Sequence, residues 1–395
     1  MVRVVQKYGG TSMRDAERIG VVAAHIRERA ELGDELIIVV SARAGVTNSL
    51  LRRAQEISSK PPAAAVDALL CIGEYETAAL LAIALNGMGV PAVSRNAYQI
   101  GIVTCSTFGN ARIRNIFGGD VEECLGAGQV VIVAGFQGID ENLCPTTLGR
   151  GGSDLTAIAL AHRFKADLCE IYTDVDGAFS GDPRVIDKPI AVKTISHGDL
   201  FKQALYDNEL MQDRSMAFAE KMGINFSIAS LFGKNPGDRT QVMEGSPCGE
   251  DCAIALTHRM DLVLISMLSE KNIFDDFLKI FAQNRVSANF MKHTKLHTSG
   301  KFLAEVAVSL LEYSQLNTSN FSALLPAEVS VINGLTRINV VGVRLEYSPW
   351  LGDLLSLMGE QEIFRAEYGK GDLSFLLKAA DPKALLNAAH RIIFE

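Results

Sequence analysis

The chain has 395 residues, of which 48% are hydrophobic, and a formal net charge of −8. This length exceeds one typical hydrophobic core, so we expect two or three domains. The acidic balance, without a long cluster of Lys and Arg, argues against a nucleic-acid partner, and no apolar run looks long enough to span a membrane. Seven scattered cysteines, an odd number, and no expected signal peptide indicate a reduced, cytoplasmic protein.

A strand and a glycine turn are predicted at the start of the chain. Residues 2–6 form an apolar run typical of a strand, and Lys7 follows it shortly before Gly9 and Gly10. An amphipathic helix comes next, for which Asp15 is a suitable N-cap. A lysine at a strand end beside a glycine turn can reach a transferring phosphoryl group. The alternative is a surface lysine before a turn.

Two further segments of the N-terminal half carry candidate polar side chains. Residues 35–42 predict a buried parallel strand that ends in a polar loop, which is where open α/β sheets bind ligands. Thr47 in this loop contacts a ligand, caps the next helix, or does both. A long helix at about residues 65–85 carries Glu74 among apolar neighbours, and its spacing alone favours a solvent-facing carboxylate.

A glycine-rich segment, residues 147–154, lies between a predicted buried strand at 129–134 and a helix at 156–163. Its glycines let the backbone approach a ligand, and the N–H groups at the helix start favour an anion. Arg150 adds a guanidinium that suits a carboxylate or phosphate. Asp154 adds an acceptor for an ammonium group or a metal-bound water. A plain strand-to-helix turn is the alternative.

These segments, with residues 171–177 after a predicted strand at 168–172, resemble the three signature segments of aspartokinases in order and spacing. The resemblance covers roughly residues 1–232. It implies the amino-acid kinase fold, an α/β domain with a mostly parallel sheet sandwiched by helices. It also implies phosphorylation of the L-aspartate side-chain carboxylate to 4-phospho-L-aspartate, with ATP and Mg²⁺, as the first step towards lysine (through diaminopimelate), threonine and methionine.

The resemblance also implies roles for individual side chains. The catalytic residues are expected to be Lys7, which neutralises the transferring phosphoryl group, and Asp154. Arg150 is expected to clamp the α-carboxylate, while Glu74 and Asp154 hold the α-ammonium group, which reverses the solvent-facing interpretation of Glu74. Further pocket residues are Thr47, Phe136 and Ser153. The phosphates and the nucleotide are expected to contact Lys7, Gly9, Gly10, Ser12, Thr173, Asp174, Phe179 and Arg184.

One segment departs from the family pattern. Where the family usually shows Gly-Ala-Lys-Val-Leu-His-Pro-Arg, residues 207–214 replace the lysine by Glu209 and keep only Arg214. An acidic group near ATP phosphates repels them, so we expect weaker nucleotide binding. Two alternatives therefore stay open: a regulatory amino-acid-binding protein that has lost turnover, and a kinase for glutamate, N-acetylglutamate or UMP.

The C-terminal part is expected to follow a linker at residues 233–252. Cys248 and Cys252 lie there without a second Cys/His pair at zinc spacing, so we expect free thiols and no metal site. Two β-α-β-β-type units of the ferredoxin-like class are predicted at 253–330 and 331–395. Strands are recognisable at 261–267 and 302–310 in the first unit, and a helix at 382–394 ends the second. Their position implies tandem ACT domains and a homodimer or larger assembly. The usual turn residues are missing, so the effector stays open between lysine, threonine and none.

Overall fold

The computed structural model describes residues 1–206, 211–233, 238–245, 252–284, 286, 288–316, 328–369 and 371–395. Glu209 lies outside the described residues. The chain divides into two compact units. The first consists of Met1–Ala178 and Ala191–Pro247, and the second of Phe179–Ile190 and Cys248–Glu395.

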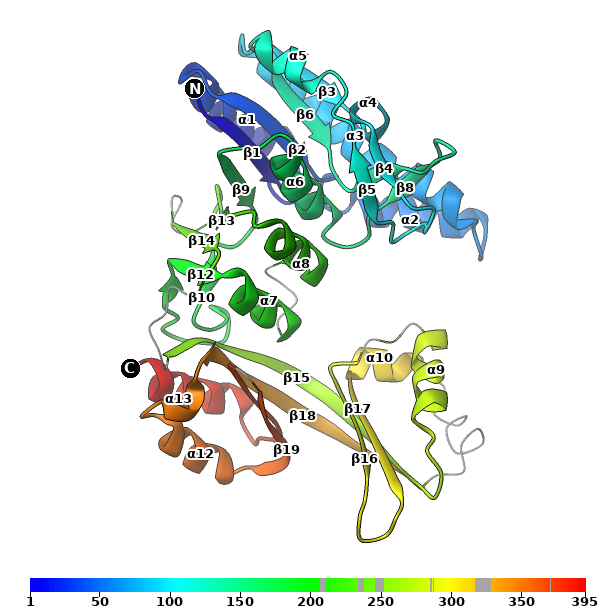
Figure 1. The fold of residues 1–395 in the computed structure, drawn as a ribbon, viewed down its shortest axis with the longest axis vertical. Helices are drawn as coiled ribbons and strands as arrows, with labels where there is room; N and C mark the ends of the chain where they lie inside the picture. Colours follow the sequence, from blue (N-terminus) through cyan, green and yellow to red (C-terminus); the bar gives the residue numbers. More distant parts are fainter. Residues whose placement is uncertain are drawn as a thin grey trace. The chain divides into compact units, whose positions relative to one another are not determined.

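An eight-stranded sheet organises the first unit (Figure 1). Its strand order is β12-β14-β13-β9-β1-β2-β6-β3, and the pairings are parallel except that between β13 and β14. Such a sheet needs helices on both faces. The strands are β1 (Arg3–Tyr8), β2 (Glu35–Val40), β3 (Ala92–Arg95), β6 (Val130–Ala134), β9 (Leu168–Tyr172), β12 (Thr194–Ser196), β13 (Phe226–Ala229) and β14 (Arg239–Met243).

Helices cover both faces of this sheet because successive strand side chains point in opposite directions. Val4 and Ile38 pack in one core with Ile26 of α1 and Leu81 of α3. On the other face, Lys7 reaches α6. The helices of this unit are α1 (Ala16–Glu31), α2 (Val46–Ile57), α3 (Ala63–Gly87), α4 (Ala97–Ile100), α5 (Val121–Gly126), α6 (Gly152–Arg163), α7 (His197–Tyr206) and α8 (Asp213–Met222).

A smaller four-stranded sheet, in the order β5-β4-β7-β8, belongs to the same unit. Its last strand leads directly into the glycine-rich segment. The strands are β4 (Ile102–Thr104), β5 (Ile113–Ile116), β7 (Gln137–Ile139) and β8 (Pro145–Thr147). A separate two-stranded sheet pairs β10 (Ala178–Phe179) with β11 (Ala191–Val192).

The long helix α3 corrects one expectation from the sequence. By length and composition alone it could cross a membrane, although no run of that kind was expected. A core helix of a soluble protein passes the same test. In α3, Ala78 and Leu85 are fully buried in the core beside the sheet, and two acidic residues, Asp67 and Glu74, are also buried. The contacts of α3 are therefore those of a core helix.

Two local features of the first unit also differ from the prediction. Helix α2 begins after Gly45, which has a left-handed φ of 82°, so Thr47 is its second residue and does not cap it. The segment expected to be a linker contains β14, which lies between β12 and β13 in the main sheet. Only Thr240 and Val242 of β14 are buried, and two alternating positions are a weak strand signal.

The second unit is built on one antiparallel sheet of six strands, in the order β16-β17-β15-β18-β20-β19. In Figure 1, β15 and β18 run from the helices α12 and α13 to the helices α9 and α10. Each half follows the order β-α-β-β-α, which contains the β-α-β-β order predicted for two ferredoxin-like repeats and adds a helix at the end. The elements are β15 (Cys252–Ser269), α9 (Phe274–Asn284), β16 (Phe290–Lys295), β17 (Phe302–Ser309), α10 (Leu310–Gln315), β18 (Glu328–Val343), η1 (Leu345–Tyr347), α12 (Leu351–Gly359), β19 (Glu362–Gly369), β20 (Asp372–Lys378) and α13 (Pro382–Phe394).

Candidate functional site

The carboxyl ends of β1, β2, β6 and β9 meet at one edge of the main sheet, where a cavity of about 650 Å³ opens. Parallel sheets bind ligands at this edge. Eleven of the residues that the sequence analysis expects at the site line this cavity. They are Lys7, Gly9, Gly10, Thr47, Glu74, Phe136, Arg150, Ser153, Asp154, Thr173 and Asp174.

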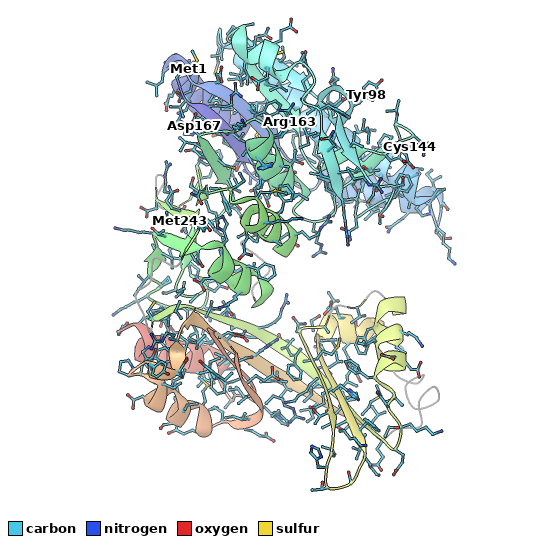
Figure 2. All side chains as sticks on the ribbon, in the orientation of Figure 1. Met1, Tyr98, Cys144, Arg163, Asp167 and Met243 are labelled. Atoms are coloured by element: carbon cyan, nitrogen blue, oxygen red, sulfur yellow. The ribbon has the colours of Figure 1, made fainter. Side chains whose placement is uncertain are left out.

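The opposite end of the sheet also has a cavity, of about 530 Å³, lined in part by Met1, Arg163 and Asp167 (Figure 2). Arg3, one of the two arginines that line this cavity, is fully engaged by protein groups. Arg3 forms ion pairs of 2.8 Å with both Glu35 and Glu122. The charges there neutralise one another, so this cavity is a weaker candidate for a ligand site.

Lys7 forms the centre of the candidate site. Its Nζ lies 2.6 Å from Oδ1 of Asp154, in the first turn of α6, and the side chains are only 9% and 13% exposed. The following turn needs glycine, because a Cβ on Gly10 would lie 2.5 Å from the carbonyl oxygen of Ala42. The chain thus places an ammonium group, oriented by a carboxylate, beside a backbone turn that a phosphate can approach.

Glu74 is buried and faces the cavity, so the solvent-facing interpretation from periodicity was wrong. Its Oε1 accepts a hydrogen bond of 3.2 Å from the backbone N–H of Ala42. Its Oε2 is buried and has no hydrogen-bond partner among the residues that the structure describes. Burial raises the pKa of this carboxyl to about 7. A buried, unpaired carboxylate oxygen suits a cationic group of a ligand.

The glycine-rich segment joins β8 to α6. Gly149 and Gly151 have φ angles of 80° and 67°, which side chains rarely adopt, and α6 begins at the next residue. Arg150 between them is exposed and lines the cavity. Within the described parts of the chain, its guanidinium makes no ion pair or hydrogen bond with protein groups. It is therefore free to bind an anion.

Phe136, between β6 and β7, supports this segment. It has a positive φ of 68°, an uncommon backbone conformation for an aromatic residue. Its carbonyl oxygen accepts a hydrogen bond of 2.8 Å from the N–H of Leu148, and its own N–H donates to Oγ1 of Thr156. Strained backbone held by neighbours in this way is typical of ligand sites.

Three residues expected at the site do not line the cavity. Ser12 is buried, and its N–H donates to the carbonyl oxygen of Gly9 at 3.0 Å. Phe179 and Arg184 belong to the second unit. Arg184 is exposed and forms an ion pair of 2.8 Å with Asp182, two residues earlier.

The sequence analysis missed Asp67, a buried carboxylate in the cavity wall. It lies on α3 seven residues before Glu74, which is two helical turns, so both carboxylates share one face of the helix. This spacing of two acids within an apolar helix was the available signal. Gly109 and Gln212 also line the cavity without having been expected there.

Comparisons with known proteins agree with this geometry. A model of the amino acid kinase family matches residues 2–230. An aspartokinase from Bacillus sp. (strain MGA3) is 34% identical over 368 residues, which cover 91% of this chain and 89% of that protein. An aspartate kinase from Pseudomonas putida is 43% identical over 237 residues, or 60% of this chain and 58% of that protein.

Solved structures show the same fold. Aspartokinase III of E. coli, in complex with lysine and aspartate, gives a TM-score of 0.80 at 22% identity and covers 99% of both chains. The same enzyme in complex with aspartate and ADP gives a TM-score of 0.74, also at 22% identity, over 99% of this chain and 100% of that one. The family model and the Bacillus aspartokinase, which matches over 91% of this chain, establish that the chain belongs to the aspartokinases, within the amino acid kinase family.

Proposed function

We propose that the protein transfers the γ-phosphoryl group of ATP to the side-chain carboxylate of L-aspartate, which yields 4-phospho-L-aspartate and ADP. One observation carries this proposal. Among the residues that the structure describes, the cavity combines a guanidinium without a protein partner at Arg150 with an unpaired, buried carboxylate oxygen at Glu74. An amino acid offers the complementary pair, an α-carboxylate and an α-ammonium group. The ammonium of Lys7 is left for the phosphoryl group.

The chemistry needs positioning and charge more than acid–base catalysis. The aspartate side-chain carboxylate is ionised at pH 7 and is itself the nucleophile, so no general base is required. Lys7 neutralises negative charge that develops on the transferring group, and Asp154 holds Lys7 in place. Asp154 also accepts from the α-ammonium group. Thr47, Phe136 and Ser153 enclose the substrate.

The nucleotide occupies the side of the cavity at Gly9, Gly10, Thr173 and Asp174. Mg²⁺ neutralises charge on the phosphates when it is bound with ATP. Asp174 is exposed beside the glycine turn, and one such carboxylate suits a cation held mainly by phosphate oxygens and water. We extend the proposal to Ser12, Phe179 and Arg184 as further nucleotide-side residues, on the resemblance of their segments to the family.

The remaining features form part of the same proposal. Residues 1–232 make up most of the kinase domain, to which the following segment adds β14, and residues 253–330 and 331–395 are two ACT-like domains. The protein works in the cytoplasm as a homodimer or larger homo-oligomer, assembled through its ACT-like domains. Its product feeds the synthesis of lysine, threonine and methionine.

A coupled assay of ADP release tests the function, with aspartate, glutamate, N-acetylglutamate and UMP as separate acceptors. We expect turnover with aspartate alone. Turnover with another acceptor would identify a different kinase of this family. Aspartate binding without any ADP release would favour the regulatory alternative, for which the acidic Glu209 is the motivating feature.

A further inference from the structure

Asp67 is the most completely satisfied carboxylate in the cavity wall, and its side chain is 1% exposed. Its Oδ2 accepts hydrogen bonds from two backbone N–H groups, those of Gly109 at 2.8 Å and Thr147 at 2.7 Å. Its Oδ1 accepts from the hydroxyl of Thr147 at 3.0 Å. Because protein donors occupy both oxygens, Asp67 is poorly placed to bind a ligand directly, in contrast to Glu74.

The donors that Asp67 holds belong to the frame of the glycine-rich segment. Thr147 is the last residue of β8 and stands three residues before Arg150. Its carbonyl oxygen accepts a hydrogen bond of 2.8 Å from the N–H of Ala111, in the loop that also contains Gly109. One carboxylate of α3 therefore fixes the entry to the segment and the loop beside it.

A guanidinium holds the same region through its carbonyl groups. Arg214 of α8 donates to the carbonyl oxygens of Leu148 at 2.7 Å and Ala111 at 2.9 Å, and also to the side chain of Asn110. The next residue, Ser215, donates its hydroxyl to the carbonyl oxygen of Gly151 at 3.2 Å. Asp67 thus accepts from backbone N–H groups just before Arg150 and in the neighbouring loop. Residues Arg214 and Ser215 of α8 donate to carbonyl oxygens on both sides of Arg150.

Between these anchors, Arg150 has glycines on both sides and an exposed side chain. Glycines give a backbone wide conformational freedom unless neighbours restrict it. We propose that Asp67 and Arg214 are positioning residues that hold Arg150 where it binds the substrate α-carboxylate, and that they thereby set the affinity for aspartate. This inference rests on the proposed function. Neither residue touches the reacting atoms.

Asp67→Asn tests the inference, because the amide carries no negative charge and has a single acceptor oxygen, so it cannot accept all three hydrogen bonds. We expect the KM for aspartate to rise about tenfold or more, the loss typical of hydrogen bonds to a charged group, while the KM for ATP stays within about twofold. Asp140→Asn is a matched control. Asp140 is 3% exposed and accepts from the N–H groups of Asn142 and Cys144, both at 2.9 Å, but it does not line the cavity.

A double-mutant cycle shows whether Asp67 acts through Arg150. In an Arg150→Ala background, Asp67→Asn should add less than about twofold to the KM for aspartate, because the positioned group is gone. A full tenfold effect in that background would overturn the inference. So would an unchanged aspartate KM in Asp67→Asn, or equal rises in the aspartate and ATP KM values.

Two milder variants keep the test decisive if Asp67→Asn does not fold. Thr147→Val removes only the hydroxyl donor, and Arg214→Lys removes the fork that reaches two carbonyl oxygens. Each should raise the aspartate KM several-fold and leave the ATP KM unchanged, and wild-type values in both would refute the positioning role. A wild-type protein without aspartate-dependent ADP release would refute the proposed function instead, which separates the two failures.

Discussion

Replacing Glu74 by Gln is expected to stabilise the protein at pH 8 while it weakens aspartate binding. Burial raises the pKa of this carboxyl from 4.5 to about 7 in the folded state. A raised carboxyl pKa means that ionisation opposes folding. The cost is absent below about pH 4.5, accumulates between pH 4.5 and 7, and is complete above pH 7. A pKa difference of about 2.5, at about 1.4 kcal/mol per unit, gives about 3 kcal/mol.

The assay is thermal unfolding of Glu74→Gln and wild type at pH 5 and pH 8. At pH 8 the variant should unfold at a higher temperature, by roughly 2–4 °C per kcal/mol for a domain of this size, and at pH 5 the stability difference should shrink to about a quarter of its value at pH 8. Glu76→Gln serves as the control, because Glu76 is exposed and forms a surface ion pair with Arg43. A stability difference that does not depend on pH would refute the reasoning from burial.

The same variant tests the role of Glu74 in binding. The α-ammonium group needs an ionised partner, so the wild-type KM for aspartate should rise as the pH falls below about 7, by up to about tenfold per pH unit. Glu74→Gln should have a high KM that changes little over this range. A variant with the wild-type KM would show that another group binds the ammonium.

Four other predictions follow from the site and the sequence. Lys7→Ala should lower kcat about a hundredfold, equivalent to about 3 kcal/mol of transition-state stabilisation, and an unchanged kcat would exclude the catalytic role. Arg150→Lys should raise the KM for aspartate and leave that for ATP nearly unchanged, because lysine cannot form the bidentate contact; a change in the ATP KM alone would place the arginine at the nucleotide. Lysine or threonine should inhibit weakly or not at all, and inhibition at sub-millimolar concentration would contradict this. Glu209→Lys should lower the ATP KM several-fold in steady-state assays, and an unchanged ATP KM would mean that Glu209 does not face the phosphates.

The sequence predicted the bounds of helices and strands most accurately where several local signals agree. The strand at 168–172 and the helix at 382–394 were predicted with the bounds that the structure gives, because one is a short, largely apolar run and the other starts with Asp381 as N-cap and Pro382. The strand β16 was missed because only Phe290 is buried among its six residues. An edge strand with one buried side chain has almost no periodic signal.

Much of the candidate site could be named from its motifs, but its geometry could not. The glycine turns and Lys7 follow a strand–turn–helix pattern that is local in the sequence. The burial of Glu74 depends on Ala42, which lies 32 residues away, and the contacts of Asp67 depend on Thr147, 80 residues away. Helical spacing describes one helix and carries no information about the segments packed against it, so it favoured the wrong orientation for Glu74 and did not single out Asp67.

The shared strands of the C-terminal sheet have a consequence for how this part of the chain can be divided. β15 pairs with β18 along nearly its whole length, from Cys252 with Val343 to Leu268 with Glu328. A truncated protein that ends before Glu328 would leave one edge of β15 with a row of unpaired backbone N–H and C=O groups. An exposed edge that long recruits other chains and promotes aggregation. The two repeats should therefore be expressed together, and a fragment that carries only the first is expected to be insoluble.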